Sequence, residues 1–273
     1  MRPLVLKLGG ELVETVQQRS GVAAWAATLG ASRPLVIVHG GGRAIDAELG
    51  RRGIVPKKVD GLRVTDAATL EAVVAVLAGS SNTDLVAALV AAGVPAVGLT
   101  GVDAGFGRAV RLPPHHSTNG ATVDLGLVGD PRDADPSLVR LLLSHRYVPV
   151  VASLGIDGAT VLNVNADVMA CRLAASLGAC DLVVAGATAG VLDDHGTTIA
   201  TLDREGIAAA IASGTATAGM VAKLDACRRA LESGVASVRI VDGRRLGAAT
   251  SIDSLAGTLL TVAAPAAAAR DLE

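Results

Sequence analysis

Aromatic side chains are almost absent from this sequence. Its 273 residues include one Trp, one Tyr and one Phe, although 51% of the residues are hydrophobic. The core must therefore consist mainly of alanine, valine and leucine, which suits helices packed closely on a parallel sheet. The lack of rings also argues against a protein that binds single-stranded nucleic acid by stacking bases on aromatic side chains.

An excess of charge of either sign is also missing. Lysine and arginine total 24 and aspartate and glutamate total 26, so the formal net charge is −2. Proteins that bind DNA, RNA or acidic membranes usually carry a basic patch. No such patch is indicated, and we expect neither nucleic acid nor a membrane as a partner.

Cysteine is scarce. Cys171, Cys180 and Cys227 are an odd number without CxxC spacing, which favours reduced, buried thiols over disulfides or a metal site. No signal peptide precedes the first expected strand, and no apolar run is long enough to span a membrane without charges or glycine. We therefore expect a cytoplasmic protein.

Strand and helix patterns alternate along the chain. This alternation predicts an α/β fold in which an open, mainly parallel central sheet has helices on both faces. The segment 106–127 is expected to form a hairpin or loop outside this sheet. Strands are predicted over 4–8, 34–38, 94–99, 147–153, 181–185, 190–192 and 237–241, and helices over 11–29, 43–50, 67–77, 82–92, 136–144, 166–177, 207–213 and 220–233.

Two predicted strands end in glycine turns. Strand 4–8 contains Lys7 and precedes Gly9-Gly10, and strand 34–38 precedes the glycines 40–42, which open a helix. Glycine amides at a helix N-terminus favour a bound anion, although a lone glycine pair is more often an ordinary tight turn. The GxGxxG and GxxxxGK[ST] patterns of two common phosphate-binding loops are absent.

Five motifs in a fixed order are more specific than any one of them. Together they resemble the amino acid kinase family, over about residues 3–258. Within the family, the resemblance is to members that phosphorylate N-acetylated glutamate. The motifs are Lys7-Leu8-Gly9-Gly10, Val38-His39-Gly40-Gly41-Gly42, Asp60-Gly61-Leu62-Arg63-Val64-Thr65-Asp66, Asn163-Val164-Asn165-Ala166-Asp167 and Gly219-Met220-Val221-Ala222-Lys223.

The resemblance implies two lobes and a phosphoryl transfer. Residues 1–175 would bind the acylated amino acid and form the dimer interface, and residues 176–273 would bind ATP. The implied reaction is phosphorylation of the γ-carboxylate of N-acetyl-L-glutamate, which gives an acyl phosphate in arginine biosynthesis. A carboxylate is already a nucleophile, so such a reaction needs positioning and cations rather than a general base.

The resemblance also assigns roles to single residues. Lys7 and Lys223 would stabilise the transferring phosphoryl group, and Asp167 would hold both lysines in place. By itself, Asp167 is equally typical of a carboxylate at a helix N-terminus. The implied nucleotide contacts are Lys7, Gly9, Gly10, Gly219 and Lys223, and the implied substrate contacts are Gly41, Gly42, Arg63 and Asn163.

Two of these residues would recognise the substrate's polar end. Arg63 would pair with the α-carboxylate, and Asn163 would hydrogen-bond the same end, with Asn165 as its weaker neighbour. By itself, an arginine in a polar loop is more often solvated, and an asparagine is often a turn residue. Lys57 and Lys58 are expected to be surface charges.

No carboxylate pair has the spacing of a metal cage, so Mg²⁺ is expected to arrive with ATP and to be held mainly by its phosphates. One position departs from the family, because Ala187 stands where members usually carry an acidic residue that helps to bind the nucleotide. Two alternatives stay open. One is a kinase for acetylaminoadipate or carrier-linked aminoadipate, and the other is an inactive relative that only binds a ligand.

The resemblance also bears on assembly. Arginine-inhibited members of the family carry an extra N-terminal helix that links dimers into a hexamer, whereas only Met1 and Arg2 precede the first predicted strand. Two residues cannot form a helical turn. Because closed two-fold dimers are the commonest assemblies, we expect a homodimer that L-arginine does not inhibit.

Overall fold

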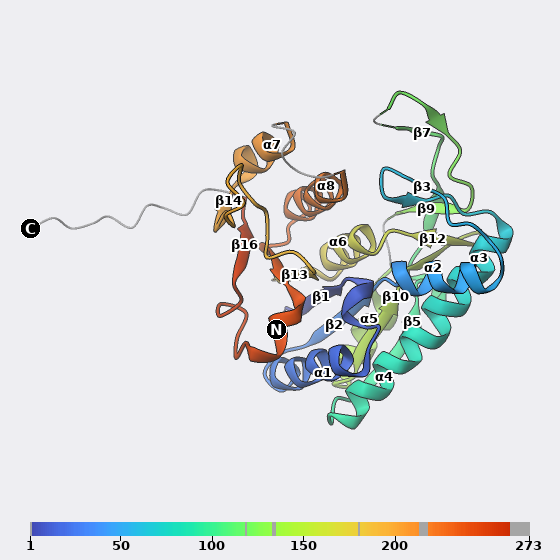
Figure 1. Ribbon diagram of the computed structural model, residues 1–273. Helices are drawn as coiled ribbons and strands as arrows, with labels where there is room; N and C mark the ends of the chain where they lie inside the picture. Colours follow the sequence, from blue (N-terminus) through green and yellow to red (C-terminus); the bar gives the residue numbers. More distant parts are fainter. Residues whose placement is uncertain (1, 118, 133–134, 180, 213–217, 263–273) are drawn as a thin grey trace, which may run out of the picture.

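The computed structural model describes residues 2–117, 119–132, 135–179, 181–212 and 218–262. An eight-stranded sheet runs through the molecule, with helices on both faces (Figure 1). Its order is β14-β16-β15-β13-β1-β2-β10-β5, and only the β15–β16 pairing is antiparallel. The predicted α/β class is therefore confirmed. The strands are β1 (Leu4–Leu8), β2 (Leu35–His39), β5 (Ala96–Thr100), β10 (Val148–Ala152), β13 (Asp181–Gly186), β14 (Thr201–Leu202), β15 (Ser237–Asp242) and β16 (Gly257–Leu260).

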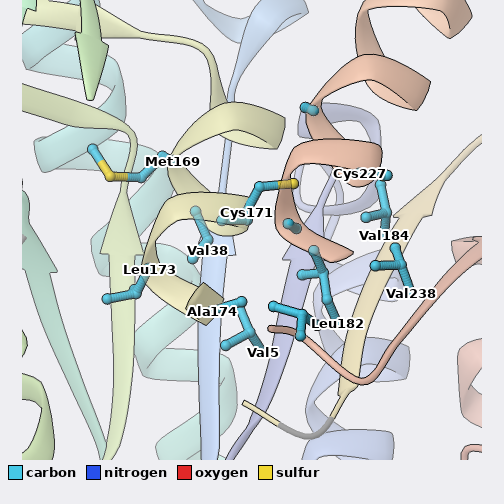
Figure 2. Close-up of a cluster of buried hydrophobic side chains, with 14 of the residues drawn as sticks. Val5, Val38, Met169, Cys171, Leu173, Ala174, Leu182, Val184, Cys227 and Val238 are labelled. Carbon is cyan, nitrogen blue, oxygen red and sulfur yellow. The ribbon is translucent and has the colours of Figure 1, made fainter. Parts of the chain in front are cut away.

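Helices of the two faces pack on alternate residues of β1. Leu4, Leu6 and Leu8 belong to the core under α1 and α4, and Val5 belongs to the core under α6 and α8. This alternation is the two-residue period of a strand buried on both faces. Figure 2 shows the second core, where small aliphatic side chains of the sheet meet α6 and α8. The helices are α1 (Val16–Gly30), α2 (Gly42–Arg51), α3 (Ala67–Val74), α4 (Asn82–Ala91), α5 (Ser137–Ser144), α6 (Ala166–Leu177), α7 (Arg204–Ala212) and α8 (Ala218–Glu232).

Three predicted helices differ in detail from the structure. The predicted helix 11–29 begins later, because a 3₁₀ turn, η1 (Gly10–Leu12), comes first and Thr15 caps α1. The Thr15 hydroxyl accepts a hydrogen bond from the Gln18 amide, and the Gln18 side chain accepts one from the Thr15 amide. The predicted helices 67–77 and 82–92 form one continuous helix, since the π-helix η2 (Ala75–Ser81) joins α3 to α4.

The strand predictions missed one edge of the sheet. β14 and β16 were not predicted, because each is short and β16 lies close to the alanine-rich end of the chain. The predicted strand 190–192 forms only an isolated bridge between Leu192 and Thr198. Its Val191 amide donates instead to the Thr258 hydroxyl at 2.8 Å, which ties this loop to β16.

A smaller sheet and two hairpins lie beside the carboxyl end of the main sheet (Figure 1). The predicted excursion at 106–127 supplies one strand of the small sheet and the hairpin of β7 and β8. The small sheet has the order β11-β12-β9-β6. Its strands are β6 (Ala109–Arg111), β9 (Val128–Pro131), β11 (Leu154–Asp157) and β12 (Thr160–Val164), and the hairpins pair β3 (Lys58–Val59) with β4 (Leu62–Arg63) and β7 (His115–His116) with β8 (Thr122–Val123).

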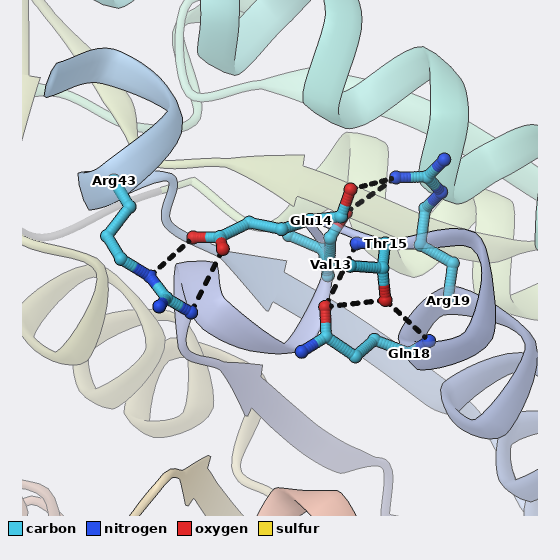
Figure 3. Close-up of polar contacts among 6 residues, drawn as sticks. All are labelled: Val13, Glu14, Thr15, Gln18, Arg19 and Arg43. Carbon is cyan, nitrogen blue, oxygen red and sulfur yellow. Dashed lines mark hydrogen bonds and ion pairs between the residues drawn. The ribbon is translucent and has the colours of Figure 1, made fainter. Parts of the chain in front are cut away.

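The segment between η1 and α1 holds the two glycine turns together (Figure 3). Arg19 of α1 donates to the carbonyls of Val13 and Glu14 at 2.9 and 3.0 Å. Arg43 of α2 binds the Glu14 carboxylate through Nε at 3.0 Å and Nη2 at 2.9 Å. Such a two-point contact fixes orientation as well as distance. Because Arg43 follows Gly42, the pair fixes the second glycine turn against the segment that follows the first.

Within the described residues, the helix Ala67–Ala91, with 25 residues, is long and apolar enough to cross a membrane. It contains Glu71, Gly79 and Asp84, and its Leu85 and Leu89 are fully buried in the core. The core helix of a globular domain passes the same test, so this helix does not indicate a membrane partner.

Two of the three cysteines can be placed. Cys171 of α6 and Cys227 of α8 are buried, free thiols, which confirms the prediction for both. Cys180 lies outside the described residues. The two placed cysteines belong to the core under α6 and α8, so they pack there as small apolar side chains.

Candidate active site

The two glycine turns meet at the carboxyl edge of the main sheet. β1 and β2 are parallel and in register from Leu4 to Leu8, so the turns leave the sheet side by side. A Cβ atom on Gly10 would lie 2.8 Å from the Gly41 Cα and the Gly42 amide nitrogen. Only glycine allows the two backbones to approach so closely.

The amides of these turns are not equally available. Gly41 is the N-cap and Gly42 the first residue of α2, so their N–H groups have no intrahelical acceptor. The Gly9 amide, in contrast, donates to the Ala185 carbonyl of β13 at 2.9 Å. The expectation that the Gly9 N–H is offered to a phosphate is therefore corrected, because this amide extends the sheet pairing of β1.

Asp167 lies between two lysines, as the resemblance implies. Its carboxylate is 2.9 Å from the Lys7 Nζ and 3.0 Å from the Lys223 Nζ. The three side chains are only 8 to 16% exposed. β1 supplies Lys7, the first turn of α6 supplies Asp167, and α8 supplies Lys223. The cluster carries one net positive charge at the edge of the sheet, which suits an anionic ligand.

The protonation of this cluster follows from its geometry. Burial by itself would raise the pKa of Asp167, but the two ammonium groups outweigh burial and hold this pKa at about 2. Burial likewise opposes the charge on Lys223, and the attraction of Asp167 nevertheless raises the pKa of this lysine. Asp167 therefore stays ionised near neutral pH and cannot act as a general base.

Asn165 orients the start of α6. Its side-chain oxygen accepts hydrogen bonds from the amides of Asp167 and Val168 at 2.8 and 3.2 Å. This N-cap places Asp167 in the first turn of the helix. Asn165, predicted as a weak substrate contact or a turn residue, is therefore used as a cap.

Arg63 is buried, so the simpler expectation of a solvated arginine is wrong. The residue is 8% exposed, and its Nη2 atom lies 2.6 Å from the Asp46 carboxylate and donates to the Gly42 carbonyl at 3.1 Å. The Nη1 atom is buried with no hydrogen-bond partner among the described residues. Burying an unpaired guanidinium donor is costly, which indicates that a ligand completes this site.

Lys58 is exposed, as expected of a surface charge, but it also forms an ion pair at the site. Its Nζ atom donates to Asp46 at 2.7 Å, so Lys58 and Arg63 share one carboxylate. Burial would raise the pKa of Asp46, but the hydrogen bonds from Lys58 and Arg63 lower it. Because two cations share this one carboxylate, the three side chains together carry a net positive charge.

A cavity of about 400 Å³ joins these features. Lys7, Asp167 and Arg63 line it together with the two glycine turns. Asn163 of β12 also lines it and donates through Nδ2 to the Thr65 hydroxyl at 3.1 Å. The cavity further includes Glu11 and Ser153, which sequence reasoning missed since neither belongs to a recognised pattern.

Comparison with known proteins decides the family. The model of the amino acid kinase family matches residues 2–242. The chain belongs to this family. It is 39% identical to acetylglutamate kinase of Symbiobacterium thermophilum over 89% of this chain and 85% of the relative. It is 40% identical to acetylglutamate kinase of Solibacter usitatus, with 90% and 93% covered, and 38% identical to the chloroplastic acetylglutamate kinase of Arabidopsis thaliana, with 95% and 75% covered.

Solved structures agree with this family. N-acetylglutamate synthase from Neisseria gonorrhoeae, complexed with coenzyme A and N-acetyl-glutamate, superposes with a TM-score of 0.82 at 26% identity over 96% of this chain and 60% of that chain. Carbamate kinase from Giardia lamblia, bound to AMP-PNP, has a TM-score of 0.67 at 15% identity over 96% and 99%. The second likeness shows the fold alone.

Two positions expected near the nucleotide lie apart from this cavity. Gly219 is exposed in the first turn of α8 and does not line the cavity. At position 187, where the sequence departs from the family pattern, the Ala187 carbonyl accepts a hydrogen bond from Arg244 at 3.0 Å. Arg244 also binds Asp242. Asp242 lies in register with Gly186 on the neighbouring strand, so a carboxylate is present beside this loop although Ala187 lacks one.

His39 is a part of the site's support that the sequence did not reveal. It ends β2, is fully buried, and places Nδ1 3.1 Å from the Gly40 carbonyl and Nε2 3.0 Å from the Asn82 side-chain nitrogen. Since a carbonyl only accepts, Nδ1 carries the proton and Nε2 accepts from Asn82. Asn82 also donates to the Val150 carbonyl at 2.9 Å. The chain of bonds orients the Gly40 peptide just before the Gly41–Gly42 turn.

Burial should make His39 a source of acid sensitivity. Burial lowers its pKa from 6.5 to about 4, and the bond to Gly40 opposes this only in part. In this pH range the His39 imidazole binds a proton in the unfolded chain but not in the folded protein, so stability is lost as pH falls from 6.5 towards 4. We predict that this residue makes folding about 2 kcal/mol less favourable at pH 5 than at pH 7. Urea unfolding at both pH values measures the change.

The matched variants separate His39 from other groups. His39→Gln should remove this part of the pH dependence, whereas His145→Gln, at an exposed position, should keep it. An unchanged difference between pH 5 and pH 7 in His39→Gln would show that another group causes the acid sensitivity.

Proposed function

We propose that this protein transfers the γ-phosphoryl group of ATP to the γ-carboxylate of N-acetyl-L-glutamate, a step of arginine biosynthesis. The relatives named acetylglutamate kinase support this substrate. The observation that carries the proposal is one cavity lined by Lys7 and Asp167, which Lys223 also binds, and by Arg63 with its unpaired, buried donor. A dicarboxylic substrate matches a cavity lined by separate cations.

The reaction needs no proton transfer. A γ-carboxylate oxygen attacks the γ-phosphorus of ATP, a new O–P bond forms, and the bond from that phosphorus to the β,γ-bridging oxygen breaks. ADP leaves with the electron pair, and the product is an acyl phosphate. Because two anions must approach each other, the protein contributes mainly fixed positive charge and orientation.

The site residues then take distinct roles. Lys7 and Lys223 neutralise charge on the transferring group, and Asp167 keeps their ammonium groups in position. The amides of Gly41 and Gly42 face the reacting groups from the start of α2. Arg63 binds the α-carboxylate through Nη1, and Asn163 contacts the same end of the substrate. Every residue that lines this cavity lies between positions 7 and 167, which supports an acyl-binding lobe over residues 1–175.

The nucleotide would bind over residues 176–273, with Gly10, Gly219 and Lys223 near its phosphates. Among the described residues, no group of three or more His, Cys, Asp or Glu side chains could hold a metal ion. The cluster is instead rich in lysine, which suits phosphates that bring Mg²⁺ with them. We place the enzyme in the cytoplasm.

A hydroxamate assay with MgATP tests the reaction. The acyl phosphate reacts with hydroxylamine, and N-acetylglutamate, N-acetylaminoadipate, glutamate, aspartate and carbamate are compared as acceptors. N-acetylglutamate should give the highest kcat/KM. A higher value for N-acetylaminoadipate would favour the sibling kinase, and no product from any acceptor would favour a ligand-binding relative.

The two lysines should affect turnover more than binding. Replacing Lys7 or Lys223 by Ala removes a cation that acts on the transition state, and we predict a fall in kcat of about two to four decades with a smaller change in KM. Steady-state kinetics measures both constants. Lys57→Ala, at an exposed lysine, should keep kcat, and a near-normal kcat in Lys223→Ala would contradict the assignment.

Arg63 should affect one substrate only. Hydrogen bonds to charged groups contribute about 1.5–3 kcal/mol, so Arg63→Ala should raise KM for N-acetylglutamate by roughly 10- to 150-fold and leave KM for ATP nearly unchanged. The exposed Arg51, in the last turn of α2, provides Arg51→Ala as the control. If both KM values rise equally in Arg63→Ala, the arginine supports the scaffold instead.

The edge of the sheet supports a homodimer. β5 is an edge strand of the main sheet, and edge strands present unpaired backbone groups that favour pairing. Large apolar side chains are exposed on the elements around it, with Val90 55%, Leu141 56% and Tyr147 44% exposed. Light scattering at several concentrations should give twice the chain mass. A monomer at every concentration would contradict this assembly.

A further inference from the structure

A second cavity adjoins the one that would hold the substrate. It has a volume of about 310 Å³ and is lined by residues of α6, α8, β9 and the β7 hairpin. Leu62, Val128 and Asn165 line both cavities, so the two spaces meet at these residues. The phosphoryl transfer makes no use of this second space.

The walls of the second cavity are mainly apolar. Leu112 lines it from the segment before β7, Val168 and Cys171 line it from α6, and Ala226 lines it from α8. Cys171 and Ala226 are only 3% and 5% exposed. A concave, largely apolar space next to a polar site is typical of a small-molecule pocket that binds an apolar group.

The charged groups that line it are of both signs. Asp225 binds Arg228 and Arg229 at 2.7 and 2.6 Å, and the His115 Nε2 atom lies 2.7 Å from the Asp60 carboxylate. Asp130, 3.7 Å from Arg132, and Arg172 add one charge of each sign. The lining therefore has no cluster of one sign that would select a charged ligand.

The residues shared by the two cavities suit one substituent of the substrate. When Arg63 binds the α-carboxylate and Lys7 the γ-carboxylate, the acylated nitrogen is the remaining polar group on the α-carbon. Leu62 and Val128, which line both cavities, offer an apolar surface to the methyl end of the acyl group.

We propose that the second cavity receives the acyl chain of N-acylglutamates longer than the acetyl compound, and that the enzyme phosphorylates them. The inference rests on the proposed function, and the bonds made and broken are the same as for N-acetylglutamate. A methylene group needs about the volume of one water molecule, roughly 30 Å³. The four additional methylenes of a hexanoyl chain therefore fill less than half of the cavity.

A chain-length series with the unaltered protein tests this inference. N-acetyl-, N-butanoyl- and N-hexanoyl-L-glutamate are compared in the hydroxamate assay with MgATP. Each buried methylene is worth up to about a fourfold gain in affinity, so KM should fall by roughly tenfold or more from acetyl to hexanoyl, at similar kcat. A steady loss of kcat/KM with chain length would overturn the proposal, because a closed pocket rejects longer chains.

A polar chain of equal length is the chemical control. N-succinyl-L-glutamate has as many acyl carbons as the butanoyl compound but ends in a carboxylate. It should be the poorer substrate, since the apolar walls would desolvate this charge without pairing it. Equal kcat/KM values for the two compounds would mean that the chain lies in solvent, which also overturns the proposal.

A variant that narrows the second cavity tests whether the acyl chain binds there. Ala226→Leu places a larger side chain on the α8 wall, and the ratio of kcat/KM for hexanoyl to acetyl substrate should fall at least tenfold. Ala24→Leu, at an exposed position of α1, should keep the ratio. If Ala226→Leu instead raises KM for MgATP and leaves the ratio unchanged, the cavity belongs to the nucleotide and the inference fails.

The two proposals fail in different ways. If N-acetylglutamate gives no acyl phosphate, the proposed function fails. If it is phosphorylated and the longer acyl compounds are not, only the second cavity has been assigned wrongly.

Discussion

The geometry of the site depends on one buried carboxylate shared by two lysines. Asp167 holds Lys7 from the first strand and Lys223 from the last α-helix, so distant parts of the chain must fold together before the site exists. Removing one member of a buried ion pair leaves an uncompensated charge and is strongly destabilising. The same contacts that would serve phosphoryl transfer therefore also help to hold α6 and α8 over the sheet.

The second constraint is the close approach of two backbones. Gly10 and Gly41 touch without side chains between them, while Glu14 and Arg43 join the segments that follow the two turns. Behind the turn, His39 hydrogen-bonds the Gly40 carbonyl and the Asn82 side chain, so these buried polar groups are paired within the core. The amides at the start of α2 are thus held in one orientation before any ligand binds, which reduces the cost of ordering them.

Most of the sheet and the cluster around Asp167 could be predicted, because buried strands and ordered motifs leave strong local signals. Arg63 and Asn163, predicted as substrate contacts, both line one cavity. The sharing of Asp46 by Lys58 and Arg63, in contrast, could not be read from the sequence. That contact joins α2 to a separate hairpin, and no fixed spacing along the sequence indicates which side chains of two such elements will meet. β16 was missed because four residues carry too little periodicity. The sequence showed His39 only as one member of a glycine motif. Its supporting role could not be predicted, because its burial depends on packing by the helix that contains Asn82.

The π-helix η2 has a consequence for the length of the chain. It inserts extra backbone into the helix from Ala67 to Ala91, and each residue of an α-helix turns the chain by about 100°. A π-helical turn takes up one more residue than an α-helical turn, so the α-helices on either side keep their relative orientation. A one-residue deletion that converts η2 to regular α-helix therefore leaves Asn82 opposite His39. This segment is one residue longer than a regular helix needs, and it can lose that residue without displacing the helices around it.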